Sequence, residues 1–173
     1  LFNLQEIYSP FNYSDLAAED ILNNKILKVY QDLSDLDKVF IISTRNFDRS
    51  NVVDDNYDYT YLYDLENEED LYSPYGRNIV VDKNYLKRHK IKSVNGKNAA
   101  DMIDIDGDVL NILVPQKYKK YERVIENSFK DWFYFQRVTV TNMYRMASNK
   151  TEIHKDIDDL NINIIYIENN QKY

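Results

Sequence analysis

Strand-like and helix-like stretches alternate along this chain, and the alternation constrains its fold more than any other feature. Three short runs of β-branched and aliphatic residues, 38–44, 109–114 and 160–167, are typical of buried strands. Two other stretches repeat apolar side chains at helical spacing. This pattern predicts an α/β (α+β) fold in which a mixed sheet contains all three runs and helices pack mainly on one of its faces.

The length of the chain favours a single domain. A chain of 173 residues buries roughly 70% of the surface that it exposes when unfolded. The chain contains no cysteine, which excludes a disulfide scaffold, a thiolate zinc site and a cysteine nucleophile. The core must therefore hold the fold without covalent staples.

The first predicted helix begins after Ser14. The Ser14 hydroxyl can cap free backbone N–H groups, and the acidic residues that follow complement the positive end of the helix dipole. Its apolar stripe is expected to pack on the sheet and consists of Ala18, Leu22, Ile26, Val29 and Leu33.

Short elements and tight turns are predicted in the middle of the chain. Residues 78–81 form a short strand, and Asp82 caps a helical turn over residues 83–89. The Asn-Gly pair at 95–96 favours a hairpin turn because both positions tolerate positive φ. Residues 102–105 and 109–114 are expected to flank Asp106-Gly107 as a second hairpin.

A second helix is predicted after Pro115, which suits the first helical position. Its apolar face is expected to be largely buried up to Trp132 and comprises Tyr118, Tyr121, Ile125, Phe129 and Trp132. Residues 133–140 are predicted to form a strand, and a short helix is expected at 143–147 before the last strand.

Composition excludes several classes of function. The chain has 22 Lys and Arg against 29 Asp and Glu, a net charge of −7, which argues against a nucleic-acid-binding protein. Only three glycines occur, so no glycine-rich phosphate cradle can be formed. We expect no cofactor and no catalytic residues, because no pair of carboxylates is marked as an acid–base pair.

Two clusters have residue types that bind metals. Residues 104–108 (Asp-Ile-Asp-Gly-Asp) resemble a calcium loop, but the glycine and the final ligand of an EF-hand are misplaced, so a turn is expected. Glu152, His154 and Asp156 alternate and could offer three ligands on one side, although a solvated connection is favoured. No metal site is assigned.

Opposite charges concentrate in two segments. Residues 54–70 carry eight acids and no base, and within them 57–65 alternate as a strand. Rings beside carboxylates suit a cationic amphipathic peptide, although strand aromatics more often pack inward. The candidate peptide-binding residues are Tyr57, Tyr59, Tyr61, Tyr63, Glu66, Glu68, Glu69 and Asp70.

Residues 83–97 carry six bases and no acid. This segment could approach anionic lipid head groups, but a solvated turn is favoured because the segment lacks an apolar anchoring face. No run of about 18 apolar residues and no signal peptide is present. The first residue is Leu1, and the last strand lies close to Tyr173. We expect residues 1–173 to be a single domain excised from a longer polypeptide.

Three stretches resemble a known family: residues 76–87 (GRNIVVDKNYLK), 94–97 (VNGK) and 110–122 (LNILVPQKYKKYE). They are similar to the extracellular region of the bacteriocin-associated integral membrane proteins, which are FtsX-like ABC transporter permeases of Gram-positive bacteria. The likeness runs from about residue 79 to residue 134 and extends to 160–167. Its motifs are short and mostly structural.

The resemblance implies an extracellular domain at the cell membrane, anchored by flanking transmembrane helices, with a separate cytoplasmic ABC ATPase as partner. It implies no catalytic residues and a role in bacteriocin or other antimicrobial peptide export, immunity or sensing. A cell-surface adhesion or protein-interaction module is the alternative. A secreted hydrolase is a third possibility, which would require a pocket with perturbed carboxylates.

Overall fold

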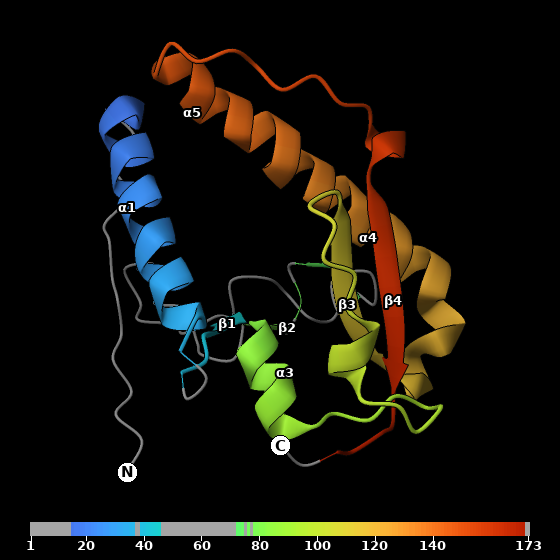
Figure 1. The fold of residues 1–173 in the computed structure, drawn as a ribbon. Coiled ribbons are helices and arrows are strands. Elements are labelled where there is room, and N and C mark those ends of the chain that lie inside the picture. Colours follow the sequence, from blue (N-terminus) through green and yellow to red (C-terminus); the bar gives the residue numbers. More distant parts are fainter. Residues whose placement is uncertain (1–14, 37–38, 46–71, 75, 77, 172–173) are drawn as a thin grey trace, which may run out of the picture.

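A parallel pair of strands, β3 (Val109–Pro115) and β4 (Asn161–Ile167), lies at the centre of the structure (Figure 1). This computed structural model describes residues 15–36, 39–45, 72–74, 76 and 78–171. The register pairs Val109 with Asn161 and Pro115 with Ile167, so the two strands end together. Both strands were predicted from their aliphatic residues, and both are confirmed.

The first predicted strand pairs elsewhere. β1 (Ile42–Arg45) and β2 (Asn78–Val81) form a separate antiparallel pair, so the described strands make two small sheets. The predicted α+β class is confirmed, but the three runs do not share one sheet. Phe40, just before β1, packs edge-on against Tyr85, with ring centroids 5.3 Å apart. Side-chain packing rather than a strand ladder therefore attaches this pair to the core.

The two faces of β3 and β4 are covered by different helices, because strand side chains alternate between faces. On one face, Ile112 and Val114 pack with Ile125 of the helix α4 (Glu122–Tyr134). On the other face, Ile165 and Ile167 pack with α3 (Lys83–His89) and η1 (Ala99–Met102). The parallel pair is thus the shared wall of two apolar clusters.

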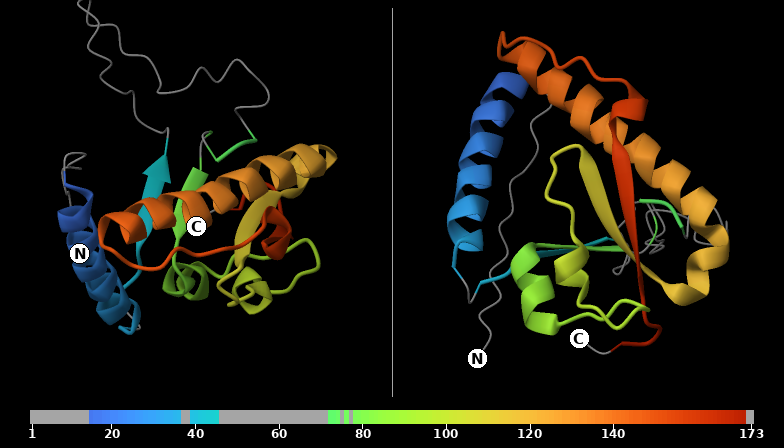
Figure 2. Two further views of the ribbon diagram at one scale, coloured as in Figure 1. Left: turned by 90° about the horizontal axis from the view of Figure 1, so that it is seen from above. Right: turned by 45° about the vertical axis from the view of Figure 1, so that its right-hand side comes forward.

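A continuous helical run leads from the end of β3, past β4, to the start of α1 (Figures 1 and 2). It consists of η2 (Gln116–Tyr121), α4, the π-helical η3 (Phe135–Val140) and α5 (Thr141–Ala147). The predicted strand at 133–140 is wrong, since these residues continue the helix begun by α4. The short helix expected at 143–147 is confirmed.

The predicted buried face of this run is confirmed in part. Ile125 is buried at 4% exposure, Phe129 packs half-buried against the same cluster, and Trp132 is half-buried. Pro115 ends β3 and directly precedes η2 with φ −56° and ψ 135°, so it lies one position before the helix rather than inside it.

The helix α1 (Leu16–Ser34) differs from prediction at its start and in its packing. Asp15 is its cap, because the Asp15 carboxylate accepts a 2.9 Å hydrogen bond from Ala18 N, while Ser14 lies outside the described residues. The predicted stripe does not pack on a sheet. Leu22 and Val29 are exposed, and α1 lies against α5 instead (Figure 2). The faces of β3 and β4 are already occupied by α4 and α3.

Two polar contacts attach α1 to the rest of the domain. Asp20 accepts hydrogen bonds from the Ser148 hydroxyl, at 2.9 Å, and from Lys150. The hydrogen bond from Lys150 lowers the pKa of Asp20 more than burial raises it, and the hydrogen bond from the Ser148 hydroxyl adds to the lowering. At the other end, the Asn84 amide of α3 donates to Ser34 O at 2.7 Å and to Val39 O at 3.0 Å.

The local signals around α3 are confirmed. Asp82 caps this helix by accepting a 2.8 Å hydrogen bond from Tyr85 N, and the helix covers the predicted residues. The Asn-Gly turn is present, with Gly96 at φ 76°, a value that glycine adopts without strain. The backbone N of Ser93 donates to Lys97 O across this turn at 2.8 Å.

The second predicted hairpin lacks one strand. Residues 106–108 turn into β3 as expected, but residues 103–106 are irregular and do not pair as a strand. The Asn111 side chain substitutes for the missing partner. Its Oδ1 accepts from Asp104 N at 2.8 Å, and its Nδ2 donates to Asp104 O at 2.7 Å.

Candidate functional site

The predicted peptide-binding residues lie outside the part of the chain that the structure describes. These residues are Tyr57, Tyr59, Tyr61, Tyr63, Glu66, Glu68, Glu69 and Asp70. Their role as a peptide-binding surface stays a prediction.

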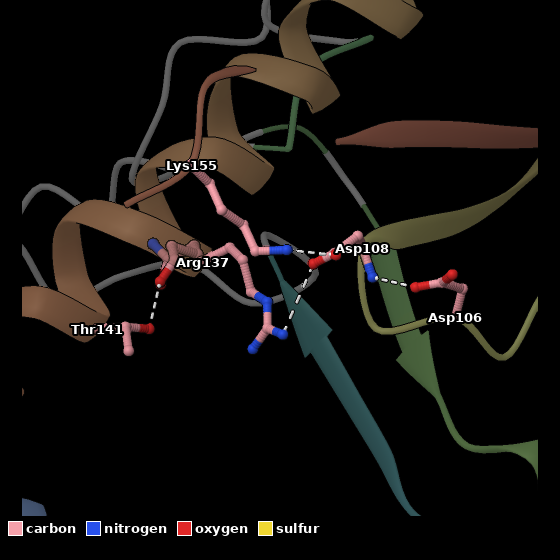
Figure 3. Close-up of polar contacts among 6 residues, drawn as sticks. Asp106, Asp108, Arg137, Thr141 and Lys155 are labelled. Atoms are coloured by element: carbon pink, nitrogen blue, oxygen red, sulfur yellow. Dashed lines mark hydrogen bonds and ion pairs between the residues drawn. The ribbon is translucent and has the colours of Figure 1, made fainter. Parts of the chain in front are cut away.

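A charged cluster centres on Asp108, where three segments of the chain meet (Figure 3). Lys155, from the connection between α5 and β4, donates a hydrogen bond to Asp108 Oδ2. The guanidinium of Arg137, from η3, lies 3.7 Å from Asp108 Oδ1. One carboxylate thus holds the helical run and the returning connection beside the start of β3.

The turn before β3 fixes the position of this carboxylate. Asp106 N donates to Asp104 Oδ1 at 2.9 Å. Asp108 N donates to Asp106 Oδ1 at 2.9 Å (Figure 3). Such short-range bonds from Asp side chains to the backbone are typical of turns. The turn expected at 104–108 is therefore confirmed, and the carboxylates of Asp104 and Asp106 accept hydrogen bonds from its backbone.

The environment of Asp108 keeps it ionised. Its hydrogen bond with Lys155 and the nearby charges of Lys155 and Arg137 hold the pKa of Asp108 below its usual range, with partial burial opposing them. A general acid at neutral pH needs a raised pKa instead. The cluster is suited to holding segments together electrostatically.

A cleft of about 380 Å³ adjoins this cluster. Its lining residues come from the helical run and from the connection after α5: Tyr134, Val138, Asn142, Ile153, His154, Lys155, Asp156 and Asp159. The Asn142 amide donates to Ile153 O at 2.9 Å and accepts from Ile153 N at 2.8 Å. The side chains of Lys155 and Asn142 thus already bind other groups of the protein, so they are not available to bind a ligand in this cleft.

The alternating cluster around His154 points to solvent. Glu152, His154 and Asp156 are exposed, whereas Ile153 and Lys155 between them are half-buried. The Asp156 carboxylate takes part in the capping box of η4 (Ile157–Asp159), in which Asp156 N donates to Asp159 Oδ2 at 2.8 Å. Within the described ranges, no three His, Asp or Glu residues are grouped as metal ligands.

Sequence reasoning did not find the Asp108 cluster. Lys155 and Arg137 are 47 and 29 positions from Asp108 along the chain, and no local motif links them. The one sequence feature that points to this cluster is the Asp-rich turn at 104–108, because it places the Asp108 carboxylate at the start of β3.

Comparisons with known proteins do not assign a family. A search against family models, curated proteins and solved structures finds no match to this chain. Among the helices in the described part of the chain, none is long and apolar enough to cross a membrane. Function is therefore argued from the residues and from the resemblance given above.

Proposed function

We propose that this chain is an extracellular, non-enzymatic domain of an ABC transporter permease that takes part in bacteriocin or antimicrobial peptide export, immunity or sensing. In this proposal the domain lies at the cell membrane, held by flanking segments, and works with a cytoplasmic ABC ATPase. Its ligand would be a cationic peptide.

The observation that carries the proposal is that the stretches resembling bacteriocin-associated permeases pack into one unit. Tyr85 and Leu86 of the first stretch are buried in a cluster that Leu113 of the third stretch contacts. The second stretch joins them through Val94 N, which donates to Tyr166 O of β4 at 2.9 Å. The resembling residues therefore include core-forming positions of a single folded body.

The chemistry of the described site supports a non-enzymatic role. Asp108 is paired with Lys155 and Arg137, and Asn142 is bonded to the backbone of Ile153. These groups hold the fold, and an enzyme needs nucleophiles or acid–base groups that are available to a substrate.

Calorimetry with a nisin-like cationic bacteriocin tests the proposal. Binding should weaken as salt is raised, because exposed charge pairs are screened over about 8 Å at physiological ionic strength. Tyr59→Ala/Tyr61→Ala removes the aromatic part of the predicted surface, and Glu68→Gln/Glu69→Gln/Asp70→Asn removes charge. Asp101→Asn/Asp158→Asn is the control, since it removes exposed acids elsewhere.

Both test variants should bind more weakly than the control variant. Equal binding by all three folded variants would reject residues 57–70 as the site. Absence of binding by the wild-type chain, combined with normal peptide resistance in a strain that lacks the gene, would reject the peptide-handling function.

An interaction module is the second candidate, because α1 exposes large apolar residues. Ile21 is 58% exposed and Leu27 is 52% exposed. Such side chains on a helix surface suit contact with another protein. A pull-down in which Ile21→Ser/Leu27→Ser loses a partner, while peptide binding is unaffected, would favour this function.

A further inference from the structure

One end of the domain carries a surface of basic side chains, which we name the basic edge. It draws on three segments: the end of α3, the turn that follows it, and η2. Its members are Lys87, Arg88, Lys90, Lys92, Lys97, Lys117, Lys119 and Lys120, and all of them are exposed.

The parallel strands bring these segments together. Lys92 O accepts from Glu168 N at 3.2 Å, immediately after β4, which fixes the turn beside the end of that strand. Lys117 N donates to Asn169 Oδ1 at 3.0 Å, which fixes η2 beside the same end. Figure 1 shows the tip of β4, the end of α3 and the start of the helical run along the lower edge of the domain.

Four lysines of this edge have no ion-pair partner among the residues that the structure describes. They are Lys87, Lys90, Lys92 and Lys97. Lys119 lies over the ring of Tyr166, 5.2 Å from its centroid, which leaves its charge in place. These charges are available to an external anion.

Acids near the basic edge are fewer and partly engaged. In the part of the chain that the structure describes, the nearest segments contribute Asp101, Glu122, Glu126 and Glu168. Glu122 accepts a 2.6 Å hydrogen bond from the Tyr166 hydroxyl. Burial first, and then the Glu122 carboxylate, raise the pKa of Tyr166 to about 12, so the phenol stays neutral.

The opposite end of the parallel pair is acidic. The turn before β3 and the η4 segment before β4 lie there, since both strands run in the same direction. Their acids are Asp104, Asp106, Asp108, Asp156, Asp158 and Asp159. Asp108 is paired with Lys155 and Arg137, and Asp158 is paired with Lys130, so the acids at this end outnumber the bases by six to three. The domain is therefore electrically polar along β3 and β4.

Val94 adds an apolar side chain to the turn of the basic edge. It is 38% exposed and lies between Lys92 and Lys97. Membrane binding by charge needs a second contribution for stability, and an exposed apolar side chain at a turn supplies one.

We propose that the basic edge is a docking surface for an anionic phospholipid bilayer, which orients the domain with its acidic end away from the membrane. Only the basic edge meets a flat surface. The acidic end lies beyond the Debye length of about 8 Å at physiological ionic strength, so the net charge of −7 repels the bilayer only weakly. The inference requires only an anionic membrane and does not depend on peptide transport.

Vesicle sedimentation with the full chain tests this proposal, using phosphatidylcholine vesicles with and without phosphatidylglycerol. Lys87→Gln/Lys97→Gln is compared with Lys25→Gln/Lys28→Gln on α1. Both variants change the net charge equally, and all four lysines are exposed. Each lysine near an anionic surface raises the binding constant about fivefold. Loss of two lysines should therefore weaken binding of the edge variant about 30-fold.

The α1 variant should bind nearly as well as the wild-type chain. Equal losses in the two variants would show that net charge alone matters and would overturn the docking surface. Absence of wild-type binding to anionic vesicles would also overturn it. Tighter binding to a polyglutamate peptide than to vesicles would assign the edge to an acidic protein instead.

Acetylation of the wild-type chain gives a result that does not depend on any variant. Anionic vesicles should protect Lys87, Lys90, Lys92 and Lys97 from the reagent, as read by mass spectrometry, and leave Lys25 and Lys28 unprotected. Equal labelling of both groups with and without vesicles would overturn the proposal.

Discussion

The side-chain amide of Asn163 donates a 2.8 Å hydrogen bond to Asn111 Oδ1, directly across the parallel strands β4 and β3. The same amide donates to Met102 O at 2.9 Å. Because Asn111 also binds the backbone of Asp104, this pair connects both strands with the irregular segment beside them. The two asparagine side chains thus bind the backbone of residues 102–104, where a third strand would otherwise pair with β3.

Replacing either asparagine should therefore destabilise the fold. Asn111→Ala and Asn163→Ala are each expected to lower the free energy of unfolding by about 1–3 kcal/mol, since partly buried partners lose their hydrogen bonds. Urea titration of both single variants and of the double variant measures the coupling. Strictly additive losses would show that the two side chains act independently.

Burial in α4 predicts a contrast between adjacent residues. Ile125 is 4% exposed and Val124 is 39% exposed. Ile125→Ala should cost about 2–5 kcal/mol through lost contacts and a cavity, whereas Val124→Ala should cost under about 1 kcal/mol. Trp132→Ala should fall between them, because Trp132 is only half-buried. Similar urea midpoints for the Ile125 and Val124 variants would contradict the assigned face.

Asn84 is expected to control the attachment of α1. Its amide binds carbonyl oxygens at the end of α1 and just beyond it, and Asn84→Ala leaves them without this donor. Hydrogen exchange should then accelerate at the end of α1, with little change in β3 and β4. Asn23→Ala, at an exposed position of α1, is the control. Unchanged exchange in the Asn84 variant would mean that α1 is held by its contact with α5.

The Asp108 cluster predicts a pH dependence with a defined sign. Because the pKa of Asp108 is lowered in the folded state, its stabilising effect is complete above the ordinary Asp pKa of about 3.9. That effect is lost as the pH falls through the lowered value. Carboxyl NMR should show the pKa of Asp108 rising in Lys155→Met and rising less in Arg137→Met. An unchanged pKa in Lys155→Met would refute the pairing.

Sequence patterns predicted correctly those elements that are stabilised by residues close together in the chain, such as capped helices and tight turns. Asp82 and the helix after it were predicted because one carboxylate and the backbone N–H groups it caps are close in sequence. Gly96 was predicted because a tight turn needs positive φ. The turn at 104–108 belongs to the same class.

The errors occur where distant contacts decide the structure. Residues 133–140 are rich in aromatic and β-branched types, but α4 already supplies the preceding helical turns, and Val138 is buried in helical form at 6% exposure. Strand propensity depends strongly on such context. The prediction that the apolar stripe of α1 packs on the sheet is wrong, because both faces of the parallel pair are covered by other elements. The partners of Asp108 depend on the same long-range arrangement.

The π-helical segment η3 makes the helical run sensitive to the insertion of a single further codon. A π-helix closes its hydrogen bonds one residue later than an α-helix, so it accommodates an extra residue within an otherwise regular helix. Each residue of an α-helix turns the chain by about 100°. Insertion of a further residue into Phe135–Val140, beyond the one that the π-helical turn absorbs, would therefore rotate α5 relative to α4 and move the α5 face that now meets α1. One codon in this segment determines which helices become neighbours.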